Sequence, residues 1–173
     1  MGTRKRIGNE AEEIVDDKLF TANCCSENAR KFHNYLNELG IELWIEKHCS
    51  LRQIERIGID LEILRDLVIR SVNHIIYYQL RDVKFNIIQY PEFKGKEKRI
   101  VVQEATTAGD LLNIVIECHF IDMSLFEITL ITAMIENNFR IFDGQYFLKL
   151  DGESSELFRK VSNNNIKIRD FGI

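Results

Sequence analysis

In the stretch LLNIVIECHFI, residues 111–121, the polar and charged side chains occur only at odd-numbered positions. The even positions are all apolar, whereas the odd positions include Asn113, Glu117 and His119. Successive side chains of a β-strand point to opposite faces, so this pattern predicts a strand with one buried apolar face and one polar face. On this interpretation His119 lies at the surface of the protein.

The neighbouring segments repeat the two-residue period. We predict about five strands within residues 85–150, from the stretches FNIIQY, RIVVQEAT, LLNIVIECHFI, FEITLITAMI and RIFDGQYFLKL. The connections between them are too short for crossover helices, so most neighbouring strands should be antiparallel. Residues 151–173 are polar and contain SNNN, and we expect a C-terminal tail or one last short element there.

The first half of the chain has a helical period instead. The apolar residues of SENARKFHNYLNELG recur three and four positions apart, which predicts a helix between Ser26 and Gly40. A second helical stretch, HCSLRQIERIG, ends near Gly58, and Asp60 has the N-cap position of a longer helix. The expected fold class is therefore α+β. N-terminal helices over about residues 8–80 would pack on a curved, mainly antiparallel sheet, in a single domain of residues 1–173.

The composition narrows the class of protein. Hydrophobic residues make up 45% and charged residues 29% of the 173 residues, with one proline, which indicates a folded chain. The sequence contains neither a long apolar run nor a secretion signal, so we expect a cytoplasmic protein without a membrane partner. The net charge of −4 argues against broad electrostatic capture of nucleic acid but allows a local basic site.

Known cofactor and metal motifs are missing from the sequence. The four cysteines lack zinc-site spacing, and no phosphate-binding loop, H-E-x-x-H, G-x-S-x-G or EF-hand pattern occurs. We therefore expect no metal and no cofactor.

His48, Arg52 and Arg56 follow one another at four-residue intervals and would share one face of a helix. A guanidinium presents donors that match phosphate oxygens, and an imidazole can give or take a proton near neutral pH. Together they suit phosphodiester cleavage without a metal. The alternative is a solvent-exposed, ion-paired helix face, because Glu55 and Glu62 lie nearby in the sequence.

The segment HCSLRQIERIGID, residues 48–60, resembles the RegB-type endoribonucleases of tailed phages, which have a histidine, two arginines and an Ile-Asp pair in this order at a helix start. The order of helices and strands is similar to the RelE, barnase, EndoU and colicin nuclease group, and the His-x-x-x-Arg stretch to BrnT-type toxins. The resemblance implies a RelE-like fold. It also implies that His48 transfers a proton, that Arg52 contacts the phosphate and that Arg56 is a substrate-binding position.

Two further catalytic positions of the RegB type have only substitutes in this chain. The second histidine would fall near Ile69, which is apolar, and His74 follows a little over one helical turn later. Glu27 is the nearest carboxylate to the upstream glutamate of the resemblance. His74 and Glu27 are therefore the substitute candidates for catalysis.

Candidate substrate contacts lie in the second half of the chain. Lys96, Lys98 and Arg99 could hold an RNA backbone as a basic loop, and the alternative is a solvated hairpin tip. Thr132 shares its predicted strand face with Phe126 and other apolar residues, where a hydroxyl would face either the backbone or substrate.

These residues lead to one functional hypothesis, a metal-independent endoribonuclease that cleaves single-stranded RNA, namely messenger RNA in a bacterial or phage-infected cell, through attack by the ribose 2′-hydroxyl. A protein partner, either a ribosome or an antitoxin, stays open, and no DNA partner is expected. The alternative is a non-catalytic binding protein on the same fold: an antitoxin, an immunity protein or a phage-encoded inhibitor of a host enzyme. A structural subunit of a larger particle is a third possibility.

Overall fold

The computed structural model describes residues 4–7, 12–13, 28–29, 31–33, 40–46, 58–82, 84–90, 98–122 and 125–171. The helix in this part of the chain is α3 (Leu61–Arg81). The strands are β1 (Arg4–Ile7), β2 (Glu12–Glu13), β3 (Asn28–Ala29), β4 (Lys31–His33), β5 (Gly40–Glu46), β6 (Ile100–Ala105), β7 (Leu111–Asp122), β8 (Leu125–Ile135), β9 (Tyr146–Asp151), β10 (Ser154–Val161) and β11 (Asn164–Phe171).

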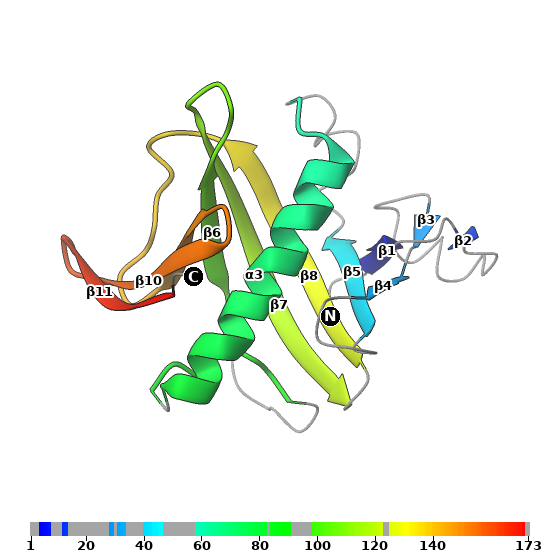
Figure 1. Ribbon diagram of the computed structural model, residues 1–173, viewed down its shortest axis with the longest axis horizontal. Coiled ribbons are helices and arrows are strands. Elements are labelled where there is room, and N and C mark those ends of the chain that lie inside the picture. Colours follow the sequence, from blue (N-terminus) through cyan, green and yellow to red (C-terminus); the bar gives the residue numbers. More distant parts are fainter. Residues whose placement is uncertain are drawn as a thin grey trace.

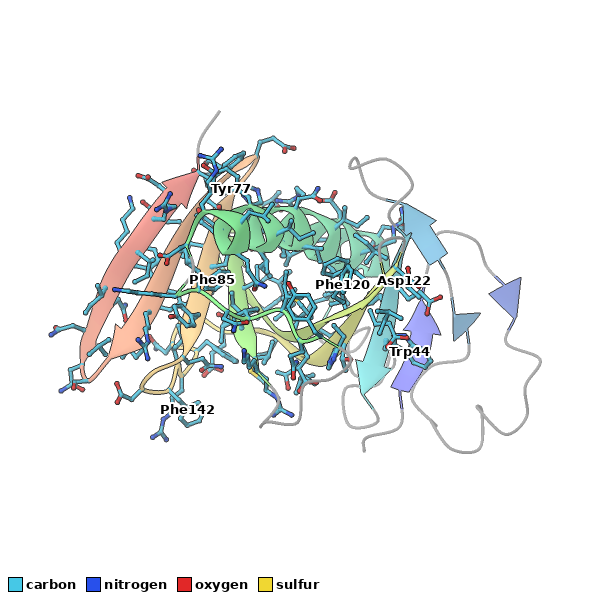
Figure 2. The ribbon with its side chains drawn as sticks, turned by 90° about the horizontal axis from the view of Figure 1, so that it is seen from below. Trp44, Tyr77, Phe85, Phe120, Asp122 and Phe142 are labelled. Carbon is cyan, nitrogen blue, oxygen red and sulfur yellow. The ribbon has the colours of Figure 1, made fainter. Side chains whose placement is uncertain are left out.

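The described strands form a mixed sheet with α3 lying across one face (Figure 1). Nine strands belong to this sheet, in the order β1-β5-β8-β7-β6-β9-β10-β11 with β4 also paired to β5, while β2 and β3 pair separately. Most neighbours are antiparallel, but β5 lies parallel to β8 and β6 lies parallel to β9. In the view of Figure 2, Tyr77 lies on the side of α3 and Phe142 lies beyond the opposite side of the sheet.

The helix begins where its sequence predicts. The side chain of Asp60 accepts a hydrogen bond from the backbone N–H of Glu62 at 2.7 Å, as an N-cap does. At the other end, the N–H of Asp82 donates to the carbonyl of Tyr78 at 2.9 Å. The predicted long helix after Asp60 is therefore confirmed. No helix in the described residues combines the length and the apolar character needed to cross a membrane.

The side chains of β7 lie alternately on the two faces of the sheet, as the sequence predicts. Its apolar even-numbered side chains belong to one core cluster with Leu64, Leu67 and Val68 of α3. Within this core, Ile116 pairs with Ile100 of β6 and with Leu130 of β8. We call this side of the sheet the helix face. The other side, which carries the odd-numbered side chains of β7, is called the polar face.

The predicted N-terminal helix between Ser26 and Gly40 is wrong wherever the structure describes that segment. Residues 28–29, 31–33 and 40–46 are strand, and Phe32 of β4 pairs antiparallel with Ile41 of β5. Ile41 and Leu43 are fully buried beside β8. Pairing of residues 31–33 with β5 outweighs local helical spacing, which is a weak preference compared with tertiary packing. The second predicted helix, which starts at His48 and ends near Gly58, lies outside the described residues up to position 57.

The predicted five-stranded sheet on N-terminal helices is also wrong at its C-terminal end. Residues 154–171, expected as a tail or one last short element, form β10 and β11, a hairpin paired to β9. Leu157 of β10 is fully buried against the core. Conversely, the predicted strand over residues 85–90 is extended with only an isolated bridge between Gln89 and His119. The RelE-like architecture is therefore replaced by a larger mixed sheet with a helix on one face.

Candidate functional site

Three side chains on the polar face form a connected acid–base group. Arg99 precedes β6, and Glu117 and His119 stand at alternate positions of β7. The Nε of Arg99 donates to Oε1 of Glu117 at 2.8 Å, and Nε2 of His119 lies 3.5 Å from Oε2 of the same carboxyl. We call Arg99, Glu117 and His119 the polar cluster.

The carboxyl of Glu117 is the buried centre of the polar cluster. Its side chain is 1% exposed, whereas that of His119 is 18% and that of Arg99 is 45% exposed. Burial by itself raises the pKa of Glu117, but the nearby imidazole of His119, the hydrogen bond from Arg99 and the charge of Arg99 outweigh it, so the pKa lies below its ordinary value. Glu117 is therefore a carboxylate at neutral pH, and it accepts a hydrogen bond from the half-exposed side chain of Arg99.

Two hydroxyls line the same face beside the polar cluster. Thr129 of β8 lies opposite Glu117, and Thr132 lies opposite Val115. The Oγ1 of Thr129 is buried and has no hydrogen-bond partner among the described residues. Thr132 was predicted to share the face of Phe126, but a register shift between Val115 and Ile116 changes the alternation of β8. The bulge turns Thr132 to the polar face.

The arrangement combines three chemical capacities. A carboxylate can accept a proton, an imidazole can donate one, and a guanidinium can neutralise charge on a phosphate oxygen. Within the described ranges, no group of three or more His, Cys, Asp and Glu side chains is arranged to hold a metal ion. The capacities of the polar cluster are those of acid–base chemistry by side chains.

The sequence-predicted residues fall into two groups. Those outside the described residues are Glu27, His48, Arg52, Arg56 and Lys96. Among the others, Arg99 and Thr132 come together on the polar face, whereas His74 does not. Lys98 directly precedes Arg99, and its carbonyl accepts a hydrogen bond from Nε2 of Gln89 at 3.4 Å.

His74 belongs to α3, on the helix face, and its side chain contacts β10. It is 5% exposed, and its Nδ1 is 2.9 Å from Oγ of Ser155. The hydroxyl of Tyr78 lies 2.8 Å from the same Oγ and donates to the carbonyl of Ser155 at 3.0 Å. Phe171 of β11 covers the His74 ring edge-on, with 4.9 Å between ring centroids. This buried network ties the helix to the C-terminal hairpin.

The buried position of His74 leads to a prediction about acid stability. Burial, assisted by the charge of Arg70, lowers the pKa of His74 from 6.5 to about 4. Between these two values the unfolded chain binds one more proton than the folded protein, so acid favours unfolding. The stabilising effect is complete above roughly pH 6.5 and is lost as the pH falls through about 4, with a size on the order of 3 kcal/mol.

Urea unfolding at several pH values between 7 and 4 measures this effect. The variant His74→Gln keeps a side chain that can bond Ser155 but has no proton to titrate, so its unfolding free energy should fall less steeply. Carboxylates contribute equally to both proteins and cancel in the comparison. Identical pH slopes for the two proteins would contradict the prediction.

Glu117 is the site residue that sequence reasoning missed. Its signal was the position two residues before His119 on the polar side of an otherwise apolar strand. A buried carboxylate is costly unless it is paired, so a glutamate in the middle of a core strand points to a nearby cation. The partner, Arg99, lies 18 residues away in sequence. Only strand pairing between β6 and β7 brings the two together.

The comparisons with known proteins identify no relative of this chain. No protein-family model, no curated protein and no solved structure matches the chain. The resemblance of residues 48–60 to RegB-type enzymes stays a prediction. The chemistry of Arg99, Glu117 and His119 is therefore the basis for assigning a function.

Proposed function

We propose that this chain is a metal-independent endoribonuclease acting on single-stranded RNA. The observation that carries the proposal is the polar cluster, in which one carboxylate lies 2.8 Å from a guanidinium and 3.5 Å from an imidazole on one face of a sheet. Cleavage by a neighbouring 2′-hydroxyl needs a base, an acid and a cation, and these three side chains are of those kinds.

Each residue then has one role in the proposed reaction. The Glu117 carboxylate accepts the proton of the ribose 2′-hydroxyl while the 2′-oxygen attacks the adjacent phosphorus. Arg99 stabilises the negative charge that builds on the phosphoryl oxygens. His119 gives its proton to the departing 5′-oxygen. The products are a 2′,3′-cyclic phosphate and a free 5′-hydroxyl, so no water is consumed in this step.

The burial of Glu117 sets a condition on how substrate enters. Its carboxylate is hydrogen-bonded to Arg99, whose side chain is 45% exposed, and Nε2 of His119 is buried beside it. An RNA phosphate competes with Glu117 for the guanidinium, because both are oxyanions that match its donors. In the proposal, binding of the phosphate draws Arg99 away and opens the carboxylate to the 2′-hydroxyl. His48 and Arg52 remain predicted contributors to the same reaction, from outside the described residues.

An RNA cleavage assay in EDTA tests the proposal. We expect the purified chain to cut a labelled single-stranded RNA and to leave cyclic phosphate ends. Replacement of every ribose by deoxyribose in the same strand should abolish cleavage, because the nucleophile is then missing. Loss of activity on chelation, or fragments ending in 5′-phosphate, would contradict a mechanism that uses side chains and the 2′-hydroxyl alone.

The near-complete burial of Glu117 favours a second candidate, a non-catalytic binding protein. A carboxylate that is 1% exposed and already paired can simply stabilise the sheet. In that case no RNA is cut, and a basic protein partner co-purifies with the acidic chain, whose net charge is −4. The EDTA assay therefore separates the two candidates, since only the nuclease leaves cyclic phosphate ends.

A further inference from the structure

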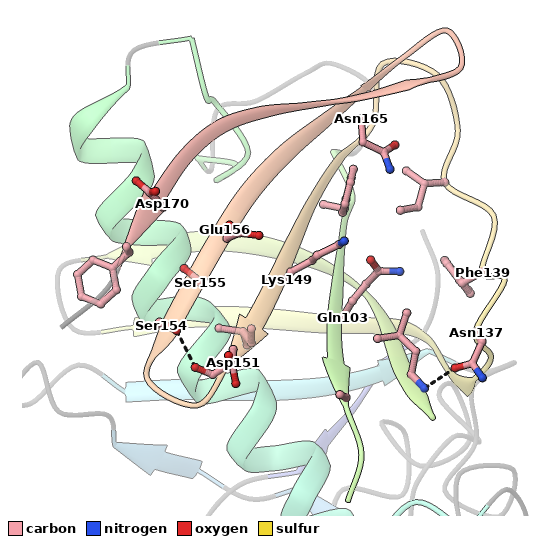
Figure 3. Close-up of a pocket in the computed structure, with 16 residues that line it drawn as sticks. Gln103, Asn137, Phe139, Lys149, Asp151, Ser154, Ser155, Glu156, Asn165 and Asp170 are labelled. Carbon is pink, nitrogen blue, oxygen red and sulfur yellow. Dashed lines mark hydrogen bonds between the residues drawn. The ribbon is translucent and has the colours of Figure 1, made fainter. Parts of the chain in front are cut away.

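A cleft of about 920 Å³ lies at the C-terminal end of β6, whereas Arg99 of the polar cluster directly precedes the N-terminal end of that strand. Its lining residues come from β6, from the start of β7, from β9 to β11 and from the loop that follows β8. Figure 3 shows Lys149 and Gln103 with their polar ends directed toward the same space, and Phe139 on the loop across from them. The cleft therefore combines a cation, an amide and an aromatic ring with three carboxylates, those of Asp151, Glu156 and Asp170.

The amide of Gln103 is held in a fixed orientation. Its side chain is 5% exposed, and its Nε2 donates to Oδ1 of the fully buried Asn113 at 2.7 Å. Asn113 in turn donates from Nδ2 to the carbonyls of Leu111 and Glu136, at 2.9 and 2.7 Å. The Oε1 of Gln103 makes no hydrogen bond to any described residue. One acceptor and the second N–H of Nε2 therefore remain for a ligand in the cleft.

Lys149 supplies the positive charge of the cleft. Its strand neighbour across the β6–β9 pair is Gln103, and its ammonium lies 5.2 Å from the centroid of the Phe158 ring. Lys149 forms no ion pair with any residue that the structure describes. By contrast, Lys167 engages the carboxylates of Glu156 and Asp170, at 2.7 and 3.2 Å. Lys149 is thus the cation of the cleft that an anionic ligand can use.

We propose that this cleft binds one nucleotide of a single-stranded RNA, with an adenine edge on Gln103, the ring against Phe139 and the phosphate on Lys149. A glutamine amide matches adenine, because Oε1 accepts from N6 and Nε2 donates to N7. Stacking on an aromatic ring and a nearby cation are the general means by which proteins hold unpaired nucleotides. The inference rests on the proposed function for the identity of the polymer.

The distance to the polar cluster agrees with one strand using both sites. Gln103 and Arg99 are four residues apart along an extended segment, about 13 Å at the rise of a β-strand. Stacked nucleotides advance by about 3.4 Å each, so a strand of five or six nucleotides reaches from one site to the other. The cleft would then select a base four or five nucleotides along the strand from the cleaved bond.

Fluorescence anisotropy with a labelled ten-nucleotide 2′-O-methyl oligoadenylate tests the cleft separately from catalysis. The methylated strand has no free 2′-hydroxyl and cannot be cut by the proposed route. Ala105→Trp fills the cleft from the exposed end of β6, and Lys149→Glu reverses its cation. We expect each to raise the dissociation constant by about tenfold or more. Lys84→Glu, an exposed charge reversal outside the cleft, should change it by less than about twofold.

The outcomes separate the two proposals. Unchanged affinity in both cleft variants, each checked to be folded by its unfolding transition, overturns the cleft as the RNA site even if the wild type cuts RNA. Loss of affinity in both supports the cleft even if no RNA is cut. Adenosine 5′-monophosphate is titrated in parallel. Binding of the mononucleotide at least as tight as that of the ten-nucleotide strand would overturn the assignment of an RNA strand.

Discussion

Replacing His119 by alanine should lower the rate of RNA cleavage by about two orders of magnitude or more, because the departing 5′-oxygen loses its proton donor. Glu117→Gln should cause a similar loss, since the amide cannot accept the 2′-hydroxyl proton. Single-turnover cleavage of a labelled RNA measures both effects. Circular dichroism and the unfolding transition check that each variant is folded.

Two comparisons make this prediction specific. Added imidazole should restore part of the activity of His119→Gly, which a purely structural role for His119 would not allow. His74→Gln should retain cleavage, because His74 lies on the helix face and is 5% exposed. If His119→Ala cuts RNA normally while His48→Ala or Arg52→Ala is inactive, catalysis belongs to residues 48–56 and the polar cluster has no catalytic role.

Replacing Leu157 by alanine should lower the free energy of unfolding by about 3–4 kcal/mol, as large-to-small changes in a closed core do. Leu157 would be exposed if residues 151–173 were a tail, but it is fully buried in β10, where it pairs with Leu148 of β9. Its side chain belongs to the same core cluster as Leu67 and Val72 of α3. The effect therefore depends on residues 154–161 being a strand.

Val161→Ala is the matched control in the same strand. Val161 is 39% exposed, so its truncation should cost well under about 1 kcal/mol. Urea unfolding gives both values under identical conditions. If the two variants are equally stable, Leu157 is not buried and the C-terminal hairpin is not part of the fold.

The residues of the polar cluster and of the cleft come together in two ways, by alternation along one strand and by pairing between strands. Glu117 and His119 are two positions apart on one strand, so alternation alone places them on the same face. Arg99 joins them through the pairing of β6 with β7, and Gln103 meets Lys149 through the parallel pairing of β6 with β9. Strands that pair in parallel are far apart in the sequence, so no local pattern indicates which strands will pair.

Sequence alone determined the features that depend on neighbouring residues. The alternation of residues 111–121 predicted the two faces of β7, and Asp60 predicted the start of α3. Tertiary structure decided the rest. Pairing with β5 made residues 31–33 a strand, where helical spacing predicted a helix. Pairing with β9 made the polar C-terminal segment a hairpin.

The physical reason is the range of the forces involved. Capping and side-chain alternation act over a few residues and can be read along the chain. Sheet pairing and core burial act between residues that are distant in sequence, and they outweigh a local preference of less than about 1 kcal/mol per residue. For this protein, local sequence therefore specified the elements at the centre of the sheet, and long-range burial specified its two ends.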